Sequence, residues 1–190
     1  MSDIIKRILS DAVVGEDGII HVDTFLNHQL DTVFLEDAGE ELAKRFKGAG
    51  ITKVLTVESS GIAIACFTAR ALGVPALYAK KFQTGYMSPQ VYESEIHSFS
   101  LSKGYTLRVS KQCLDENDVV LIADDILANG QAILGLLEIV AKAKAEVAGV
   151  GVVIEKGGKD GGRILRQIGI RLESLAVVDK VENGKLVLRD

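Results

Sequence analysis

VVLIADDILANGQAILGLLEIV, residues 119–140, starts with an apolar run, meets the acidic pair Asp124–Asp125 and passes through a small-residue turn into a segment with helical spacing. A continuous apolar run of this length is typical of a strand buried on both faces, as in a parallel sheet. The stretch therefore predicts a strand–loop–helix unit. Its loop would open at the carboxyl edge of the sheet, where α/β proteins bind ligands.

The chemistry of this loop points to a phosphorylated sugar. Backbone N–H groups at the start of a helix can hold a phosphate. Two carboxylates just before that helix can accept hydrogen bonds from the hydroxyls of a sugar attached to the phosphate. Phosphate beside vicinal hydroxyls describes a ribose 5-phosphate.

The composition is that of a globular protein with one core. The chain has 190 residues, of which 47% are hydrophobic and 25% charged, so we predict one domain over residues 1–190. Lys and Arg number 22 against 26 acidic residues, which gives a net charge of −4, and no arginine-rich run occurs. This balance disfavours a nucleic-acid partner.

Cysteine and targeting signals are few. The two cysteines form no Cys-x-x-Cys pair and the histidines are not clustered, which disfavours zinc, and Cys66 is predicted to be a small buried hydrophobe. The N-terminal segment is amphipathic and includes acids, unlike a signal peptide, and no apolar stretch approaches the length of a membrane span. We therefore expect a cytoplasmic protein without a membrane partner.

Periodicity and turn residues divide the chain into alternating strands and helices. Helices are predicted over residues 2–14, 35–46, 62–72 and 163–168, together with the helix that closes the segment 119–144. Strands are predicted over residues 19–22, 53–57, 76–79, 147–154, 170–178 and 185–188, the last two as edge strands, besides the one that opens 119–144. Residues 81–110 have a mixed pattern and are interpreted as a long hairpin or mobile arm. The β-α-β order predicts a parallel sheet with right-handed crossovers.

Four segments carry a resemblance to a known family: VDTFLNHQLD (22–31), ITKVLTVESSGIA (51–63), ADDILANGQA (123–132) and GVVIEK (151–156). The third resembles the phosphoribosyl-diphosphate (PRPP) motif of type I phosphoribosyltransferases. The wider chain is similar to the xanthine phosphoribosyltransferases of bacterial purine salvage. The resemblance implies an α/β fold with a mainly parallel twisted sheet flanked by helices. It also implies a small hood, built from about residues 1–34 with the C-terminal strands.

The same resemblance implies a reaction. PRPP and xanthine would give xanthosine 5′-monophosphate (XMP) and pyrophosphate. Mg²⁺ would be carried mainly by PRPP and pyrophosphate, because a hard cation suits their oxygens, so no protein metal site is predicted. A homodimer is also implied.

Asp124 and Asp125 are the catalytic candidates. In the family such carboxylates bind the ribose hydroxyls and stabilise the oxocarbenium-like charge that develops at C1, as carboxylates do in glycoside cleavage. The alternative is a pair of solvated charges at a strand end. Adjacent carboxylates that leave a buried strand repel each other and need cations or hydroxyl donors, which favours the functional interpretation.

The loop after the acidic pair is the candidate for the 5-phosphate of PRPP. It comprises Ala128, Asn129, Gly130, Gln131 and Ala132. The alternative is an ordinary strand-to-helix turn with Asn129 as the N-cap. Many family members carry Thr at the positions of Ala128 and Ala132, so here backbone amides, Asn129 and Gln131 would bind the phosphate. This departure matches the xanthine branch.

Two further segments are candidates for the pyrophosphate end of PRPP. By resemblance, Glu58, Ser59, Ser60 and Gly61 form the loop that receives pyrophosphate, although alone they would be interpreted as a capping turn. Lys80 and Lys81 follow a third strand and would supply positive charge at the same edge, the alternative being a solvated surface pair. The arm would then exclude water during transfer.

Base recognition is assigned to three residues. Lys156 follows the last buried strand and can donate to an exocyclic oxygen, whereas the alternative is a surface lysine. Asn27 offers both a donor and an acceptor to the purine edge, and it is equally interpretable as a turn residue. Ile20 matches the apolar contact of the family at the base, and from the residues alone a core role explains it as well.

Three alternatives to a xanthine enzyme remain at this stage. A hypoxanthine/guanine or an orotate transferase would use the same motif, although the Asn27 and Lys156 segments favour an oxopurine. A PRPP-sensing, non-catalytic regulator typically adds an N-terminal DNA-binding domain, for which the N-terminal segment is too short. A structural role leaves the two phosphate loops and the acidic pair unexplained.

Overall fold

The centre of the protein is a six-stranded sheet in the order β10-β9-β8-β7-β3-β4. A computed structural model describes residues 2–15, 19–82, 88–96 and 104–189. The strands are β3 (Lys53–Val57), β4 (Ala76–Ala79), β7 (Val119–Leu127), β8 (Glu146–Lys156), β9 (Leu172–Glu182) and β10 (Lys185–Leu188). All neighbours from β4 to β9 are parallel and only β10 is antiparallel, which confirms the predicted mainly parallel sheet.

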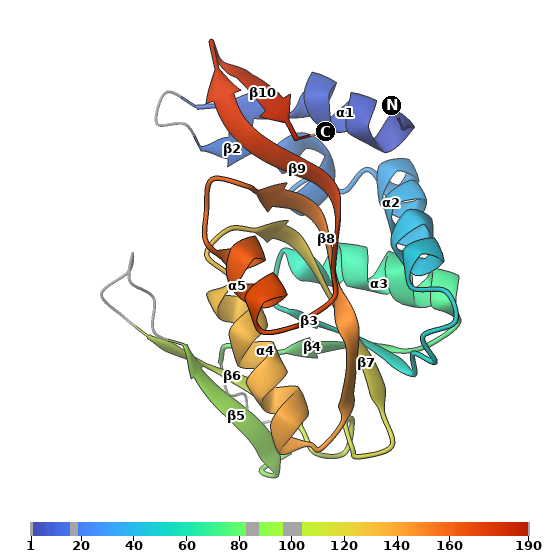
Figure 1. The fold of residues 1–190 in the computed structure, drawn as a ribbon. Coiled ribbons are helices and arrows are strands. Elements are labelled where there is room, and N and C mark those ends of the chain that lie inside the picture. The colour runs from blue at the N-terminus through green and yellow to red at the C-terminus, as the bar shows by residue number, and fades with distance from the viewer. Residues whose placement is uncertain (1, 16–18, 83–87, 97–103, 190) are drawn as a thin grey trace.

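Helices cover both faces of this sheet (Figure 1). α2 (Thr32–Arg45) and α3 (Gly61–Leu72) lie on one face, and α4 (Gln131–Lys142) and α5 (Gly161–Gln167) lie on the other. From β3 the chain continues outward to β4, whereas from β7 it continues the opposite way to β8 and β9. The strand order therefore reverses between β3 and β7, and such a switch point leaves a crevice at the carboxyl ends of the two strands.

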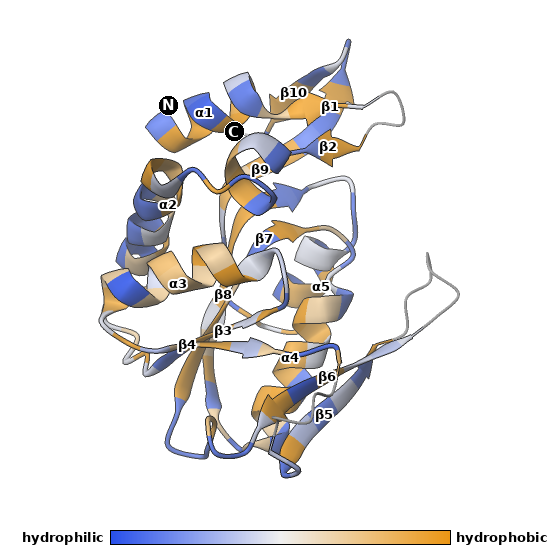
Figure 2. Cartoon of the chain, turned by 180° about the vertical axis from the view of Figure 1, so that it is seen from behind, coloured by the Kyte–Doolittle hydropathy of each residue, from blue (hydrophilic) through white to orange (hydrophobic). Residues whose placement is uncertain are grey.

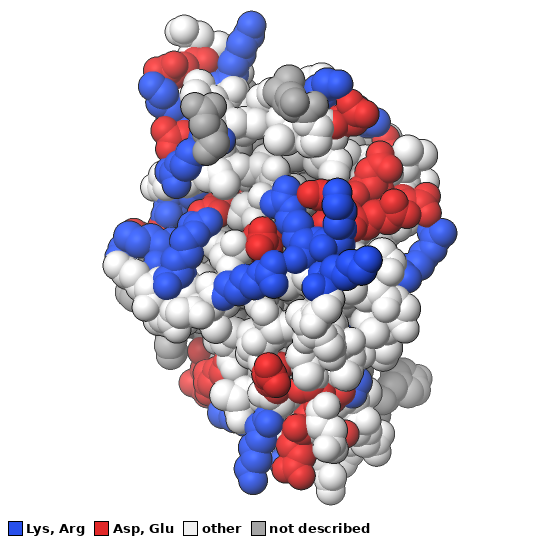
Figure 3. Space-filling model, turned by 45° about the vertical axis from the view of Figure 1, so that its right-hand side comes forward, with Lys and Arg blue, Asp and Glu red and all other residues white. Residues whose placement is uncertain are grey.

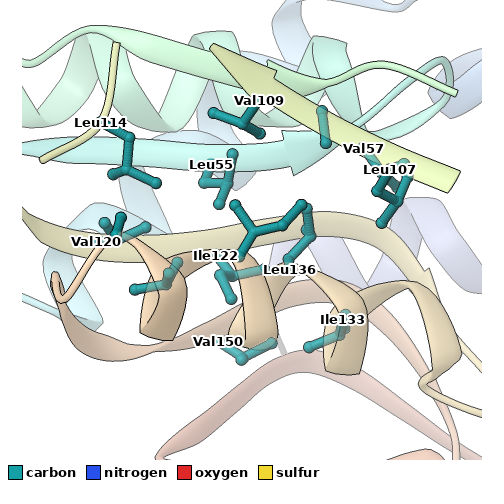
Figure 4. Packing of buried hydrophobic residues seen from close by; sticks show 14 of the residues in the cluster. Leu55, Val57, Leu107, Val109, Leu114, Val120, Ile122, Ile133, Leu136 and Val150 are labelled. Carbon is teal, nitrogen blue, oxygen red and sulfur yellow. The ribbon is translucent and has the colours of Figure 1, made fainter. Parts of the chain in front are cut away.

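The largest part of the core lies between the sheet and α4. Ile133, Leu136 and Val140 recur at helical spacing and pack on Val120 and Ile122 of β7, all of them at most 1% exposed (Figure 4). Figure 2 shows the same hydrophobic character along β7, β8 and α4. Each such side chain contributes about 1.5–3 kcal/mol when it is fully buried, so this contact fixes the orientation of α4 on the sheet.

The N-terminal segment and the last strand meet at one end of the molecule (Figure 1). This end contains α1 (Asp3–Asp11), β1 (Val13–Val14), β2 (Ile20–His21) and the π-helical turn η1 (Asp23–Asn27). One apolar cluster joins Ile8 of α1 and Phe25 of η1 to Phe34 of α2 and Val178 of β9. The rings of Phe25 and Phe34 meet edge to face at 4.9 Å, so η1 packs directly on α2.

The described part of the predicted arm 81–110 is a hairpin. β5 (Val91–Ile96) and β6 (Tyr105–Ser110) pair antiparallel, and the Ser94 hydroxyl donates to Glu138 of α4 at 2.7 Å. Residues 83–87 and 97–103 of the arm lie outside the described residues. The hairpin interpretation is thus confirmed for the paired strands.

Several predicted boundaries were wrong for identifiable reasons. The second helix begins at Thr32 and not at Leu35, because the Asp31 carboxylate accepts from the N–H groups of Val33 and Phe34, both at 3.1 Å. The first helix ends at Asp11, because Val13–Val14 pair with Ile20–His21. Of the two predicted edge strands only β10 is at the edge, since β9 lies between β8 and β10.

The prediction for Cys66 was also wrong. Its side chain is exposed. The buried residues of α3 fall at Gly61, Ile64, Ala65, Thr68 and Ala69, which form one helical face. Position 66 lies off that face, so its apolar neighbours in the sequence are not its neighbours in space.

Charged side chains of both signs share the surface. Figure 3 shows a face on which Lys and Arg lie beside Asp and Glu. Surface ion pairs of this kind include Arg70–Glu36 at 3.0 Å and Arg45–Glu41 at 3.0 Å. Exposed pairs of this type contribute little to stability. None of the described helices has both the length and the apolar character needed to cross a membrane.

Gly39 of α2 provides a test of the helix packing. A Cβ at Gly39 would lie 2.7 Å from the backbone carbonyl carbon of Phe67 and 2.8 Å from the N atom of Thr68 in α3. We expect Gly39→Ala to lower the free energy of unfolding, because overpacking against backbone costs about 1–3 kcal/mol and outweighs a helix-propensity gain of about 1 kcal/mol. Urea unfolding measures this change.

Gly158→Ala is the matched control for this prediction. A Cβ there would meet only the Asp179 carbonyl oxygen at 3.7 Å, an ordinary contact. Its free energy of unfolding should stay within about 0.5 kcal/mol of the original protein. Equal stability of the two variants would contradict the proposed close approach of α2 and α3.

Candidate active site

The site lies where β3 and β7 separate. Their last paired residues in the described chain are Leu55 and Ile122, although β3 continues to Val57 and β7 to Leu127. The sequence predicted that the acidic pair would follow the strand. The structure places both acids inside β7, because β7 stays paired to β8 as far as Leu127 and Glu155.

Asp124 and Asp125 are both buried, with exposed fractions of 7% and 4%. Neighbouring residues of a strand point to opposite faces. Asp125 accepts from the Ser60 hydroxyl at 3.0 Å and from the Asn27 amide at 3.2 Å. Asp124 lines a cavity on the other face and accepts the N–H of Asp125 at 3.0 Å. The interpretation of the pair as solvated charges is therefore wrong.

The surroundings of Asp124 disfavour its charged form. Burial, and then the neighbouring charge of Asp125, hold the pKa of Asp124 well above its ordinary value of 3.8. The positive charge of Lys81 opposes this shift but does not cancel it. A cation or a hydroxyl donor brought beside Asp124 would favour ionisation.

The predicted phosphate loop borders the same cavity. Residues 128–132 line it together with Asp124, Ile96 and Tyr105, and its volume is about 210 Å³. The N-cap of α4 is Gly130, with φ +77°, and not Asn129, and no side chain of the described chain caps this helix. The first-turn N–H groups of α4 are thus available to an anion at a terminus with favourable partial charge.

The second predicted loop lies against the acidic pair. Ser60 occupies the N-cap of α3, but its hydroxyl donates to Asp125 and makes no capping bond. Glu58 accepts the backbone N–H of Lys81 at 2.6 Å, and the Glu58–Ser59 peptide bond is cis. A Cβ at Gly61 would collide with the Thr56 hydroxyl and lie 2.6 Å from the Asp124 carboxylate. Only glycine fits at the start of α3.

The two lysines have different surroundings. The Lys81 ammonium lies 5.3 Å from the centre of the Tyr105 ring and acts electrostatically on Asp124. The Lys80 ammonium lies 5.8 Å from the centre of the Tyr78 ring, in a separate cavity that Arg108 also lines. The structure thus brings Lys81, and not Lys80, to the acidic pair.

The three base candidates also separate. Asn27, at the end of η1, reaches Asp125 across 98 positions of sequence. Lys156 ends β8 half-buried, and its ammonium makes no hydrogen bond or ion pair within the described residues. Ile20 is 7% exposed and packs in the apolar cluster of the hood. Its surroundings are those of a core residue.

Comparison with known proteins supplies the family. A family model described as the phosphoribosyl transferase domain matches residues 29–164, well over half of the chain. The chain belongs to this phosphoribosyltransferase family. The family assignment made from the sequence is thereby confirmed, together with the fold class.

Relatives of this phosphoribosyltransferase match over nearly their full length. The xanthine phosphoribosyltransferase of Clostridium novyi is 47% identical, over 97% of each chain. That of Heliobacterium modesticaldum is 49% identical, over 98% of this chain and 99% of its own.

Solved structures of adenine phosphoribosyltransferases share the fold. The Rhodothermus marinus structure has a TM-score of 0.76 at 22% identity and covers 92% of this chain and 98% of its own. The Trypanosoma brucei structure, a complex with AMP, pyrophosphate and ribose-5-phosphate, has a TM-score of 0.78 at 16% identity and covers 97% and 84%. At these identities the likeness shows the fold alone.

Three features of the phosphoribosyltransferase site were not predicted from the sequence. Tyr105 lines the cavity, and burial, followed by the charge of Asp124, raises its pKa. The Thr56 hydroxyl is buried without a hydrogen-bond partner in the described chain. Glu155 is 2% exposed and pairs with Arg166. Only Glu155 had a sequence signal, as an acid at the end of a very apolar strand.

Among the described residues, no three His, Cys, Asp or Glu side chains gather as a metal site.

The raised pKa of Asp124 predicts how stability depends on pH. The folded state binds a proton more tightly than the unfolded state, so the ionised carboxylate lowers stability once the pH exceeds the ordinary value of 3.8. Asp124→Asn should therefore raise the free energy of unfolding at neutral pH, and the gain should shrink as the pH falls toward 3.8. Urea unfolding over a pH series measures it.

Asp118→Asn is a control of opposite sign. Burial raises the pKa of Asp118, but hydrogen bonds from Lys53 and from the backbone N–H of Asp115 outweigh it and lower the pKa below 3.8. This variant should lose stability at neutral pH, and the loss should shrink in acid. The same sign of change in both variants would refute this description of the acidic pair.

Proposed function

We propose that this protein transfers the 5-phosphoribosyl group from PRPP to xanthine, which forms XMP and releases pyrophosphate in purine salvage. The arrangement that carries the proposal is the pair of buried carboxylates beside two helix starts that no described side chain caps. A ligand with an anionic group at either end and hydroxyls between them matches this arrangement. The xanthine phosphoribosyltransferase relatives support xanthine as the acceptor.

The proposed binding assigns one group of PRPP to each element. The first turn of α4 and residues 128–132 hold the 5-phosphate, and Glu58–Gly61 with Lys81 receive the pyrophosphate. Lys80 also stays a candidate to supply positive charge to the pyrophosphate, although it lines a different cavity. Asp124 and Asp125 accept from the ribose hydroxyls, which replace the Ser60 and Asn27 donors of Asp125.

In the proposed reaction the bond from C1 to the pyrophosphate oxygen breaks and a bond from C1 to a ring nitrogen of xanthine forms. That nitrogen gives up its proton to water, and the electrons of the broken C1–oxygen bond leave with pyrophosphate. The two carboxylates stabilise the positive charge that develops at C1. Positioning of both reactants supplies much of the remaining acceleration.

The proposed base contacts come from two sides of the site. The ammonium of Lys156, which has no partner among the described residues, donates to an exocyclic oxygen. The Asn27 amide binds the purine edge once it leaves Asp125. Ile20 stays a proposed apolar contact that would require movement of the hood cluster. Ile96 and Tyr105 line the cavity from the hairpin, which supports the proposal that the arm 81–110 covers the site and keeps water from C1.

We propose that Mg²⁺ enters with PRPP. Its ligands would come mainly from the diphosphate oxygens and from water, which suit a hard cation. When bound, it would supply positive charge to the pyrophosphate that leaves.

We also propose a homodimer in the cytoplasm. Tyr78 of the edge strand β4 and Phe82, which follows that strand, are 40% and 77% exposed and offer apolar surface for a second copy.

A side-by-side assay tests the acceptor. PRPP and Mg²⁺ are supplied with xanthine, guanine, hypoxanthine, adenine or orotate, and nucleotide and pyrophosphate are both measured. We expect the highest kcat/KM with xanthine. A higher value with guanine or hypoxanthine would replace xanthine as the acceptor, and no product with any base would remove the proposed function.

The acidic pair is tested by Asp124→Asn combined with Asp125→Asn. Loss of preorganised charge at C1 should lower kcat by at least about a hundredfold. Far-ultraviolet circular dichroism should be unchanged. Glu146→Gln is the control. Glu146 is an exposed acid at the first residue of β8, whereas the proposed site lies at the other end of that strand, near Lys156. Near-normal turnover by the double variant would exclude the pair from the reaction.

A further inference from the structure

α5 touches the phosphate loop at its first residue. The N–H of Gly161 donates to the Ala128 carbonyl oxygen at 3.0 Å. A Cβ at Gly161 would collide with that oxygen and lie 2.8 Å from the N atom of Gly130. In return, a Cβ at Gly130 would lie 3.1 Å from the Cα of Gly161. The two backbones therefore pack directly on each other.

The other end of α5 holds the end of β8. Arg166 donates through both terminal nitrogens to the two carboxylate oxygens of Glu155, each at 2.7 Å. The Ser174 hydroxyl of β9 donates to the same carboxylate at 2.6 Å. A Cβ at Gly162 would collide with Glu155 and lie 2.8 Å from the Nη1 atom of Arg166. Two parallel hydrogen bonds fix orientation as well as distance.

α5 is anchored between these two contacts. Leu165 is fully buried in the main core, so the helix cannot slide toward either end. Lys156 follows Glu155 directly and carries the ammonium without a partner in the described chain. The backbone that presents Lys156 is therefore fixed relative to residues 128–130 through one short helix.

We propose that the Glu155–Arg166 pair is a positioning brace which sets the distance between the base-binding end of β8 and the 5-phosphate loop. The inference rests on the proposed function and deepens it, because it names residues that control the site without touching the substrates. Arg166 acts on xanthine through Glu155 and Lys156. Gly161 acts on PRPP through the 128–132 loop.

The physical reason is that the two reactants must meet at C1 with little error. A displacement of about 1 Å by a remote change can cost on the order of a hundredfold in rate. Removal of Arg166 leaves the Glu155 carboxylate buried with Ser174 as its remaining hydrogen-bond donor among the described residues. A buried charge that loses its partner is strongly unfavourable, so the end of β8 would rearrange toward solvent.

Arg166→Met tests the brace, with Arg163→Met as its matched control. Both arginines lie on α5 and both pair with an acid. Among the described residues, however, Arg163 bonds only to Asp160 and Gln167, at the surface. We expect Arg166→Met to lower kcat/KM for xanthine by about ten- to a hundredfold, with KM for PRPP changed less than about threefold. Arg163→Met should leave both values unchanged.

A conservative variant of Arg166 and a variant of Gly161, at the other end of α5, extend the test. Arg166→Lys keeps one charged donor and should recover part of the loss for xanthine. Gly161→Ala should raise KM for PRPP more than KM for xanthine. Thermal unfolding of each variant measures the fraction folded. If Arg166→Met does not fold, Arg166→Lys is compared with Arg163→Lys for the same selective change in xanthine.

The outcomes are distinct. A selective loss for xanthine in the Arg166 variants supports the brace. Unchanged kinetics with lowered stability, or a rise in KM for PRPP as large as that for xanthine, overturns it and leaves a purely structural ion pair. If the original protein transfers to no base, the proposed function fails and the brace fails with it. An active original protein with unaffected Arg166 variants removes the brace alone.

Discussion

The burial of two adjacent carboxylates inside β7 is the constraint on which the rest of the structure depends. Asp124 and Asp125 are 7% and 4% exposed, and buried carboxylates need hydrogen-bond donors or cations. Asp125 accepts hydrogen bonds from neutral donors of α3 and η1, and burial raises the pKa of Asp124. The ionised form of Asp124 therefore lowers stability in the free protein. A ligand that brings hydroxyls and a cation would relieve it, so stability and binding are linked at this strand.

The topology of the sheet decides what surrounds this pair. Because the strand order reverses between β3 and β7, α3 and α4 begin on opposite faces but at the same edge. Both helix starts without side-chain caps therefore flank one crevice. Gly61 allows α3 to begin beside Asp124, and the glycine contact of α5 with the 128–130 loop fixes the other side. Each close approach needs a residue without a side chain at that position.

Long-range contacts connect the hood and α5 to this crevice. The Asn27 amide donates to Asp125, so a hood residue and a catalytic candidate share one hydrogen bond in the free protein. The Glu155–Arg166 pair connects the end of β8 to α5. Neither contact has a local signature in the sequence. Lys80 and Lys81 show the opposite case, in which neighbours in sequence have different surroundings. Lys80 lines a cavity with Arg108, whereas the positive charge of Lys81 acts on Asp124.

The sequence by itself determined the alternation of strands and helices, the parallel sheet, the acidic pair and the two strand-to-helix turns that are proposed to bind anions. These features depend on apolar periodicity and on glycine, which act within a few residues. The sequence placed Cys66 in the core, and the structure reversed this prediction. The alternative interpretation of Asn129 as a helix N-cap is also wrong, because Gly130 occupies that position. Only the tertiary structure decided that β7 continues past its acids, that Lys81 and not Lys80 approaches them, and that Arg166 reaches Glu155. These outcomes depend on where separate elements meet, and packing between elements is not encoded in any one local pattern.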